Sequence, residues 1–534
     1  MDVKTATEVA VLHHALVGVA EEMGEALKRA AYSPNIKERQ DYSCALFDAQ
    51  GRLLAQAAHL PVHLGSMPAS VAAVISSVDF QKEGDFAIVN DPYDGGTHLP
   101  DITMVAPVFA GTTSWKAGGE VRVRRGRRLI GYVANRAHHA DVGGAAPGSM
   151  SPQTDLIAEG LVIPPVLFER DGQISPDVLA IVMANTRTPD ERLGDLHAQL
   201  AACDRGIHRV IAIEQQYGSK KFQALCNALY KHAAQLLRDN LKSLKRGSFR
   251  SEDVLDDDGA GTTDIRIRCS LTVSRDKLTF DFSDSDQQVR GGVNAVRAVT
   301  ASASFYSVLC LCDPRPPINH GCFEHIEVIT KPGTVVDAKR PAPVAGGNVE
   351  TSQRIVDVCL GALAQAAPGR VPAQSQGTMN NLTIGGVGSD GKPFTYYETI
   401  AGGCGAGPGR TGASATHSHM TNTLNTPAEA LEHAYPLRVE EYALREGSGG
   451  DGKHRGGDGV VRRIRTLVPA TFGLLTERRT SSPKGAEKGK PGRQGINQVR
   501  YNDGEVEPVD AKCSGELEPG EAIDMRTPGG GGWR

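Results

Sequence analysis

The stretch that organises the sequence reads Asn90-Asp91-Pro92-Tyr93-Asp94-Gly95-Gly96-Thr97-His98-Leu99-Pro100-Asp101. A second stretch of the same character reads Asn135-Arg136-Ala137-His138-His139-Ala140-Asp141-Val142-Gly143-Gly144. Imidazoles and carboxylates are ligands for divalent metals of borderline hardness, and glycine lets the backbone turn and approach closely. These residues alone allow two interpretations. They form a metal site, or they form two polar turns in a β region whose histidines act as caps or hydrogen-bond partners.

Length and composition predict a multi-domain protein with an α+β fold. The chain has 534 residues, 40% of them hydrophobic and 22% charged, and single cores stop growing at roughly 250–300 residues. Helical periodicity before residue 250 gives way to the alternation typical of strands after residue 263. We therefore expect mixed and antiparallel sheets with packed helices and Gly-rich loops. The expected division is an N-terminal region, residues 1–250, and a C-terminal region, residues 251–534, that contributes to the substrate pocket and the partner interface.

The spacing of apolar residues predicts the main elements. Helices are expected at 6–31, from 195 to about 243, within 292–312 and at 352–367. Strands are expected at 42–47, 52–55, 86–89, 102–109, 129–135, 326–330 and in a pair between 265 and 282. The acidic stretch 253–258 is interpreted as a turn, and the glycines at 529–532 as a tail that is flexible or inserted into a partner.

Charge and cysteine usage exclude several classes of function. The net charge of -4 gives no electrostatic case for binding nucleic acid or an anionic membrane. Five arginines between Arg122 and Arg128 are interpreted as solvated charges at a hairpin tip. No apolar run is long enough to span a bilayer and no signal peptide is visible, which predicts a cytoplasmic protein. The ten cysteines contain no C-x-x-C pair and are expected to be buried free thiols.

Four side chains are candidates to converge at one sheet edge. His98 and Asp101 share the first Gly-rich loop, while Asp41 and His138 stand at the ends of neighbouring predicted strands. Two imidazoles and two carboxylates suit zinc, manganese or iron better than calcium. Asp41 taken alone favours a strand-start cap.

The sequence resembles the hydantoinase B/oxoprolinase family. The resemblance rests on the two stretches above, on His59-Leu60-Pro61-Val62-His63-Leu64-Gly65-Ser66-Met67, and on motifs at both ends, Glu21-Glu22-Met23-Gly24 and Pro528-Gly529-Gly530-Gly531-Gly532-Trp533. It implies a metal site at Asp41, His98, Asp101 and His138. His138 is chosen over His139 because the family pattern resembles His-x-x-Asp-x-Gly-Gly. His139 or Asp141 is the alternative ligand or an orienting group, and His59 and His63 are held in reserve.

The resemblance also implies a function and a partner. It implies that this chain is the metal-containing subunit of an ATP-dependent cyclic amide hydrolase. The catalytic residues implied are Asp101, His98 and His139. ATP is expected to be used by a separate hydantoinase A-like ATPase subunit in a hetero-oligomer, because this sequence shows no Walker motif. Two rival hypotheses are a subunit of an ATP-dependent ketone carboxylase, acting on acetone or acetophenone, and a non-catalytic scaffold for the ATPase subunit.

Overall fold

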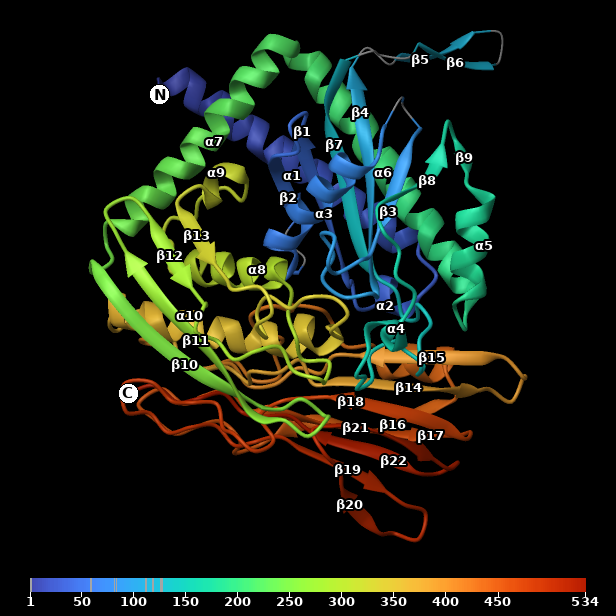
Figure 1. Cartoon of the computed structure of the whole chain (residues 1–534), viewed down its shortest axis with the longest axis vertical. Coiled ribbons are helices and arrows are strands. Elements are labelled where there is room, and N and C mark those ends of the chain that lie inside the picture. The colour runs from blue at the N-terminus through green and yellow to red at the C-terminus, as the bar shows by residue number, and fades with distance from the viewer. Residues whose placement is uncertain are drawn as a thin grey trace.

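The computed structural model (Figure 1) describes residues 2–57, 60–80, 82, 84–110, 113–117, 120–124 and 128–534, with the backbone alone for 113–117 and 120–124. Helices and several sheets build an α+β, multi-domain structure, which confirms the predicted fold class. Among the described residues, no helix has the length and apolar character needed to cross a membrane.

A seven-stranded antiparallel sheet forms the core of the N-terminal region. Its strand order is β2 (Leu53–Ala57), β1 (Tyr42–Asp48), β7 (Arg128–His138), β4 (Asp101–Ala110), β3 (Phe86–Val89), β8 (Val166–Arg170) and β9 (Gln173–Ile174). Alternate residues of β1 face opposite layers. Cys44 and Leu46 join the cluster that contains helices α1 and α6, while Ala45 and Phe47 pack against α3. Because helices cover both faces, the central strands are almost continuously buried and apolar.

Long helices cover this sheet (Figure 1). They are α1 (Val3–Ala30), α3 (His63–Ser77) and α6 (Pro189–Tyr217), while α7 (Ser219–Leu241) packs against α1 and α9 (His320–Phe323). The predicted helix at 6–31 is confirmed by α1. The single helical span predicted after residue 195 is wrong, because Gly218 has a φ of +74° and separates α6 from α7. A left-handed residue ends a helix and redirects the chain.

The middle of the chain forms a four-stranded sheet that packs against two helices. Its strand order is β10 (Gly247–Asp257), β11 (Thr263–Val273), β12 (Leu278–Asp281) and β13 (Ile326–Ile329), and its helices are α8 (Arg297–Leu309) and α10 (Ser352–Ala366). The predicted strand pair corresponds to β11 and β12. The acidic turn predicted at 253–258 is wrong, since most of it lies in β10. Asp253 pairs there with Arg478, 3.0 Å away, so a partner distant in sequence overrides the turn preference of aspartate.

Two further sheets enclose a second core in the C-terminal region. One has the order β15 (Pro393–Glu398), β14 (Asn381–Val387), β18 (Ala470–Leu475) and β21 (Lys512–Leu517). The other has the order β16 (Leu437–Arg445), β17 (Gly459–Thr466), β22 (Ala522–Arg526), β19 (Ile496–Arg500) and β20 (Val506–Pro508). Their inward side chains share one hydrophobic cluster, as in a β-sandwich.

The remaining elements are short. The helices are α2 (Pro34–Lys37), α4 (Leu156–Glu159), α5 (Pro176–Ala184), α9 (His320–Phe323), α11 (Ala428–Ala434) and a π-helical turn, η1 (Gly347–Thr351).

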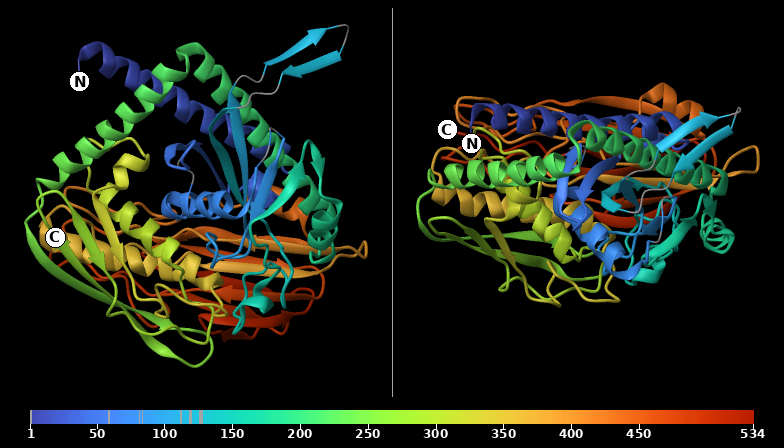
Figure 2. Two further views of the ribbon diagram at one scale, coloured as in Figure 1. Left: turned by 45° about the horizontal axis from the view of Figure 1, so that its top comes forward. Right: turned by 90° about the horizontal axis from the view of Figure 1, so that it is seen from above.

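Strands β5 (Thr113–Ala117) and β6 (Glu120–Arg124) form a hairpin that projects from the body of the protein (Figure 2). The prediction that the arginine-rich stretch forms the hairpin tip is wrong for its described part, because Arg122 and Arg124 pair with Trp115 and Thr113 inside the hairpin and the turn lies between residues 117 and 120. Residues 125–127 lie outside the described residues, and the solvation of the stretch stays a prediction.

The C-terminal glycines are built into the protein itself. Gly530 donates its backbone N–H to the carbonyl of Gly457, 2.9 Å away, and Gly532 donates to the carbonyl of Lys490 at 2.8 Å. A Cβ added to Gly530 would lie 2.0 Å from the carbonyl oxygen of Cys404. The expectation of a flexible or partner-inserted tail is therefore wrong, because the glycines allow this segment to pack directly against other backbone segments.

The predicted thiols are mostly confirmed. All ten cysteines are free, and six of them are buried. Cys312, Cys404 and Cys513 are half-buried, and Cys310 is exposed just beyond the end of α8.

Candidate metal centre

Three of the four predicted ligands meet at one end of the N-terminal sheet. Asp101 is the first residue of β4 and His138 the last residue of β7, and the antiparallel register places them directly opposite each other. His98 Nε2 lies 3.1 Å from Asp101 Oδ1, and His138 Nδ1 lies 3.4 Å from the same oxygen. All three residues are buried, and each offers a ligand atom within 4.8 Å of the other two.

This spacing fits a divalent ion. Two atoms that each bind a tetrahedral ion at about 2.1 Å lie about 3.4 Å from each other. Two imidazoles and one carboxylate form a mixed nitrogen–oxygen donor set suited to zinc, manganese or iron. His98, Asp101 and His138 would hold the ion.

The loop before β4 is folded so that His98 is fixed in place. The Asn90 side chain donates to the carbonyl of Leu99 at 2.8 Å and accepts from the N–H of Ile163 at 2.6 Å. Gly95 has a φ of +89°, and a Cβ on Gly96 would lie 2.5 Å from the carbonyl oxygen of Asn90. Only glycines permit this close turn, so the Gly-rich motif is needed for the geometry of the loop.

Asp101 is the electrostatic centre of the cluster. Thr97 donates its hydroxyl to Asp101 Oδ2 at 2.9 Å, and His63 Nε2 lies 3.4 Å from the same oxygen. Burial acts to raise the pKa of Asp101, but the neighbouring His98, His138 and His63 outweigh it and hold the pKa well below its usual range. Burial also lowers the pKa of His63 and of His138, which favours the neutral imidazole that binds metals.

The fourth predicted ligand, Asp41, lies beside the cluster without joining it. Its backbone carbonyl accepts from the N–H of His138 at 3.0 Å, and its carboxylate lies 3.7 Å from the guanidinium of Arg39. Burial raises the pKa of Asp41, while His138 and Arg39 act to lower it. Asp41 therefore contributes negative charge next to the three-residue cluster, and its role as a ligand stays a proposal.

The alternative residues take different positions. His139 points to helix α6, where its Nε2 lies 2.9 Å from Gln199 Oε1, and burial lowers its pKa to about 4. Asp141 pairs with Arg187 at 2.8 Å. Of the two reserve residues, His63 contacts Asp101, whereas His59 lies outside the described residues. The structure thus groups His138 rather than His139 with His98 and Asp101.

Two residues distant in sequence complete the surroundings of the cluster. Asn348 Nδ2 lies 3.1 Å from His98 Nε2. The Tyr397 ring stacks on His138, with ring centroids 4.6 Å apart and planes inclined by 13°. Sequence reasoning missed both. Asn348 follows the run Ala345-Gly346-Gly347, and nothing in that segment of the sequence indicates which residue lies next to it in space.

The π-helical turn η1 also carries Glu350, a buried acid that connects to the same surroundings. Glu350 Oε1 accepts from the N–H of Met379 at 2.9 Å and from Asn381 Nδ2 at 2.8 Å. Asn381 Oδ1 in turn accepts from the hydroxyl of Tyr397 at 2.9 Å. Burial and the nearby Glu477 raise the pKa of Glu350 to about 7. Short π-helical segments occur frequently at functional sites.

The chain belongs to the hydantoinase B/oxoprolinase family, whose sequence model matches residues 5–534. It is 39% identical to an uncharacterized protein of Methanocaldococcus jannaschii, over 96% of this chain and 88% of the relative. It is 37% identical to 5-oxoprolinase 1 of Arabidopsis thaliana, over 100% of this chain but only 42% of that longer protein. A Pseudomonas protein named as one subunit of a putative D-/L-hydantoinase is 30% identical, over 98% of this chain and 89% of its own length.

A solved structure shares the fold. The ATP-dependent caprolactamase from Pseudomonas jessenii aligns with a TM-score of 0.89 and 27% sequence identity, covering 99% of this chain and 91% of that one. The resemblance inferred from the motifs is thereby confirmed at the level of the family.

Proposed function

We propose that the chain is the metal-containing subunit of an ATP-dependent hydrolase that opens cyclic amides. The observation that carries this proposal is the buried cluster of His98, Asp101 and His138, in a family whose relatives include proteins named 5-oxoprolinase and caprolactamase. An unstrained amide is a poor electrophile because its nitrogen donates electrons into the carbonyl group. Phosphorylation of the amide oxygen by ATP removes that resonance, after which water can attack the carbon.

The residues of this chain supply the second half of that reaction. His98, Asp101 and His138 would hold a divalent ion, which when bound would lower the pKa of water toward neutrality. His63 and Thr97 hold the carboxylate of Asp101 in one orientation. Asn348 presents its amide next to His98, where it can orient the polar group of a substrate. Stacking on Tyr397 fixes the ring plane of His138.

A separate subunit is proposed to supply the ATP chemistry. The match with the Arabidopsis 5-oxoprolinase covers 42% of that protein's length. The Pseudomonas relative, which is named as one subunit of a hydantoinase, supports an arrangement in which two chains share the work. We infer that the partner is an ATPase subunit of the hydantoinase A type in a hetero-oligomer. Scaffolding alone does not account for the buried donor cluster.

The proposal is tested by co-expressing the chain with that ATPase subunit and assaying the purified complex. We expect co-elution of the two chains and ring opening of 5-oxoproline, hydantoin or caprolactam only when ATP is present. Acetone or acetophenone with bicarbonate is the comparison assay. Carboxylation of the ketone without ring opening of any cyclic amide would assign the chain to the carboxylases and reject the proposal.

A further inference from the structure

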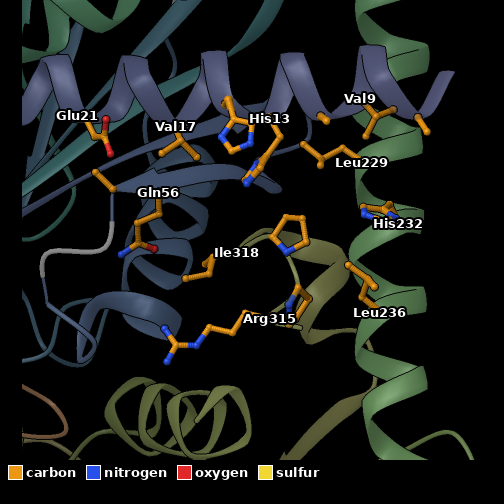
Figure 3. Close-up of a pocket in the computed structure, with 16 residues that line it drawn as sticks. Val9, His13, Val17, Glu21, Gln56, Leu229, His232, Leu236, Arg315 and Ile318 are labelled. Atoms are coloured by element: carbon orange, nitrogen blue, oxygen red, sulfur yellow. The ribbon is translucent and has the colours of Figure 1, made fainter. Parts of the chain in front are cut away.

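Figure 3 shows a pocket of about 680 Å³ between helices α1 and α7, strand β2 and the loop at residues 315–318. Its polar side chains stand on different sides of it, with Gln56 on β2, His232 on α7 and Arg315 on the loop. This pocket therefore shows no group of charges gathered around one point. A second pocket, in the C-terminal region, differs in this respect.

The second pocket, of about 750 Å³, lies at the end of β16, between the loop at residues 479–495 and strands β19 and β20. Three arginines line it, Arg445, Arg479 and Arg493, and no aspartate or glutamate is among the described residues of its lining. The whole chain carries a net charge of -4, so this concentration of positive charge is local. The volume is in the range of pockets that hold small molecules.

Two of the guanidinium groups lie against the same peptide group. Arg445 Nη1 donates to the carbonyl of Gln494, 2.6 Å away. A Cβ added to the next residue, Gly495, would lie 2.6 Å from Cζ of Arg479. Arg445 and Arg479 therefore meet at one point of the pocket, although they are far apart in the sequence.

Arg493 lies close to Arg445. Its backbone N–H donates to the carbonyl of Ser448 at 2.8 Å, and the backbone N–H of Ser448 donates to the carbonyl of Arg445 at 3.3 Å. Burial lowers the pKa of Arg445, and the nearby Arg526 and Arg493 lower it further. The three arginines of the pocket therefore form one group of like charges.

Among the residues that the structure describes, no carboxylate forms an ion pair with these three arginines. Arg445 donates only to backbone carbonyls. Arg479 donates to Asn497 Oδ1 at 2.8 Å and to a backbone carbonyl at 2.6 Å. Burial lowers the pKa of Arg479 to about 10, although Glu350 and Asp256 oppose this shift. An anion bound in the pocket would stabilise the group of charges.

Several donors of the group are free to meet a ligand. Arg445 Nε and Nη2 make no hydrogen bond to the described residues, and neither is a buried atom. The Arg493 side chain is exposed. Guanidinium groups bind phosphate oxygens through paired N–H donors. Ile496, Pro508 and Val509 add an apolar wall to the pocket, so a compact oxyanion with more than one charge fits, with or without a small apolar body.

We propose that this pocket binds a doubly charged phosphate group, either free or esterified to a small organic molecule. The guanidinium groups of Arg445 and Arg493 donate to the phosphate oxygens, Arg479 adds positive charge, and the apolar wall covers the organic part. None of the three clustered metal-site residues lines this pocket. The inference therefore concerns a different site from the proposed catalytic one and does not depend on it.

Isothermal titration calorimetry on the full-length chain at pH 8 and constant ionic strength tests the proposal. Phenyl phosphate is the probe, and phenyl sulfate is its control of similar shape with one negative charge instead of two. Phenyl phosphate should bind, and phenyl sulfate should bind at least about tenfold more weakly. Inorganic phosphate identifies the source, because affinity equal to that of phenyl phosphate assigns the site to the free ion and weaker affinity assigns it to an ester.

Three results would overturn the proposal. They are no binding of phenyl phosphate, equal affinity for phenyl phosphate and phenyl sulfate, and tighter binding of hexaglutamate than of phenyl phosphate. The last result would make the arginines a docking surface for an acidic protein segment.

Two variants with the same change of charge test the named contact. Arg493→Gln should weaken binding of phenyl phosphate at least about tenfold. Arg438→Gln, in which an exposed arginine of β16 outside the pocket is replaced, should leave the affinity unchanged. Both replaced side chains are exposed, so the melting temperature of the free protein should not change in either variant. Equal affinities in both variants, whether weakened or not, would reject the site.

Discussion

At the scale of single residues, two adjacent histidines at the end of β7 contact different partners. His138 faces Asp101, whereas His139 faces Gln199 on α6. We therefore predict that His138→Ala lowers bound metal from about one equivalent per chain to a small fraction of it, and that His139→Ala does not. Elemental analysis of the purified variants measures this. Equal metal loss in the two variants, or none in either, would contradict the assignment of His138 as the ligand.

The buried acid Glu350 leads to a prediction about pH. Its pKa is raised from 4.5 to about 7 by burial and by Glu477, so between these values the folded chain binds more protons at this residue than the unfolded chain does. The contribution of Glu350 to the free energy of unfolding therefore falls as pH rises through that window. This stabilising contribution is lost completely above pH 7. The stabilisation is fully present only below the unfolded pKa.

Glu350→Gln keeps an acceptor for Met379 and Asn381 and removes the titration. We expect the variant to become more stable relative to the wild type, by roughly 1–3 kcal/mol, as pH rises from 5 to 8. Urea unfolding at several pH values measures the difference, and titrating groups remote from Glu350 cancel because both proteins contain them. A stability difference that does not change with pH would show that folding does not raise the pKa of Glu350.

At the scale of elements, the glycine-rich segments hold the C-terminal region together through direct backbone contacts. Gly530→Ala should destabilise the protein by roughly 1–3 kcal/mol or more, because the new Cβ would lie 2.0 Å from the carbonyl oxygen of Cys404. Gly18→Ala, in the interior of α1 with no atom within 4 Å of its added Cβ, should stabilise by about 0.5–1 kcal/mol. Chemical unfolding of the pair measures both, and a neutral Gly530→Ala would mean that the tail is loose.

The sequence was most informative where the signal was local. Apolar periodicity predicted α1, β1 and α10, and the spacing of His98 and Asp101 placed both on one loop. The break at Gly218 was missed because the periodicity continues on both sides of it. The strand at Asp253 was missed because its stabilising partner, Arg478, is far away in the sequence. Asn348 and Tyr397 were missed for the same reason, since nothing in their own segments indicates that the fold brings them to His98 and His138.

At the scale of the whole molecule, the metal centre depends on contacts from across the chain. One hydrophobic cluster contains residues from Val9 to Leu475, and a second one residues from Leu382 to Met525. The first cluster includes Tyr397, which stacks on His138. The division at residue 250 stays a prediction, and the shared core implies that the two parts position the site together.

The last prediction concerns the coupling of this chain to its proposed ATPase partner. The proposed function assigns activation by phosphate to the partner and attack by water on the activated carbon to the cluster around Asp101. Asp101→Ala should therefore reduce ring opening at least about 100-fold, or ~2.7 kcal/mol in activation free energy, while ATP hydrolysis by the complex partly survives. Asp239→Ala, an exposed carboxylate of α7, is the matched control and should leave both rates unchanged.

The measurement is paired, with released phosphate and ring-opened product quantified in the same complex. Loss of product with phosphate release preserved means that the two half-reactions are separable and that the cluster acts after activation. Attack on the activated carbon needs a hydroxide equivalent, which free water does not supply at neutral pH. If the variant forms product at the wild-type rate, the cluster around Asp101 does not supply it, and its role is structural. Loss of both phosphate release and product formation in a complex that still assembles would mean that the partner hydrolyses ATP only when this site is intact. Activation and attack would then be one coupled step.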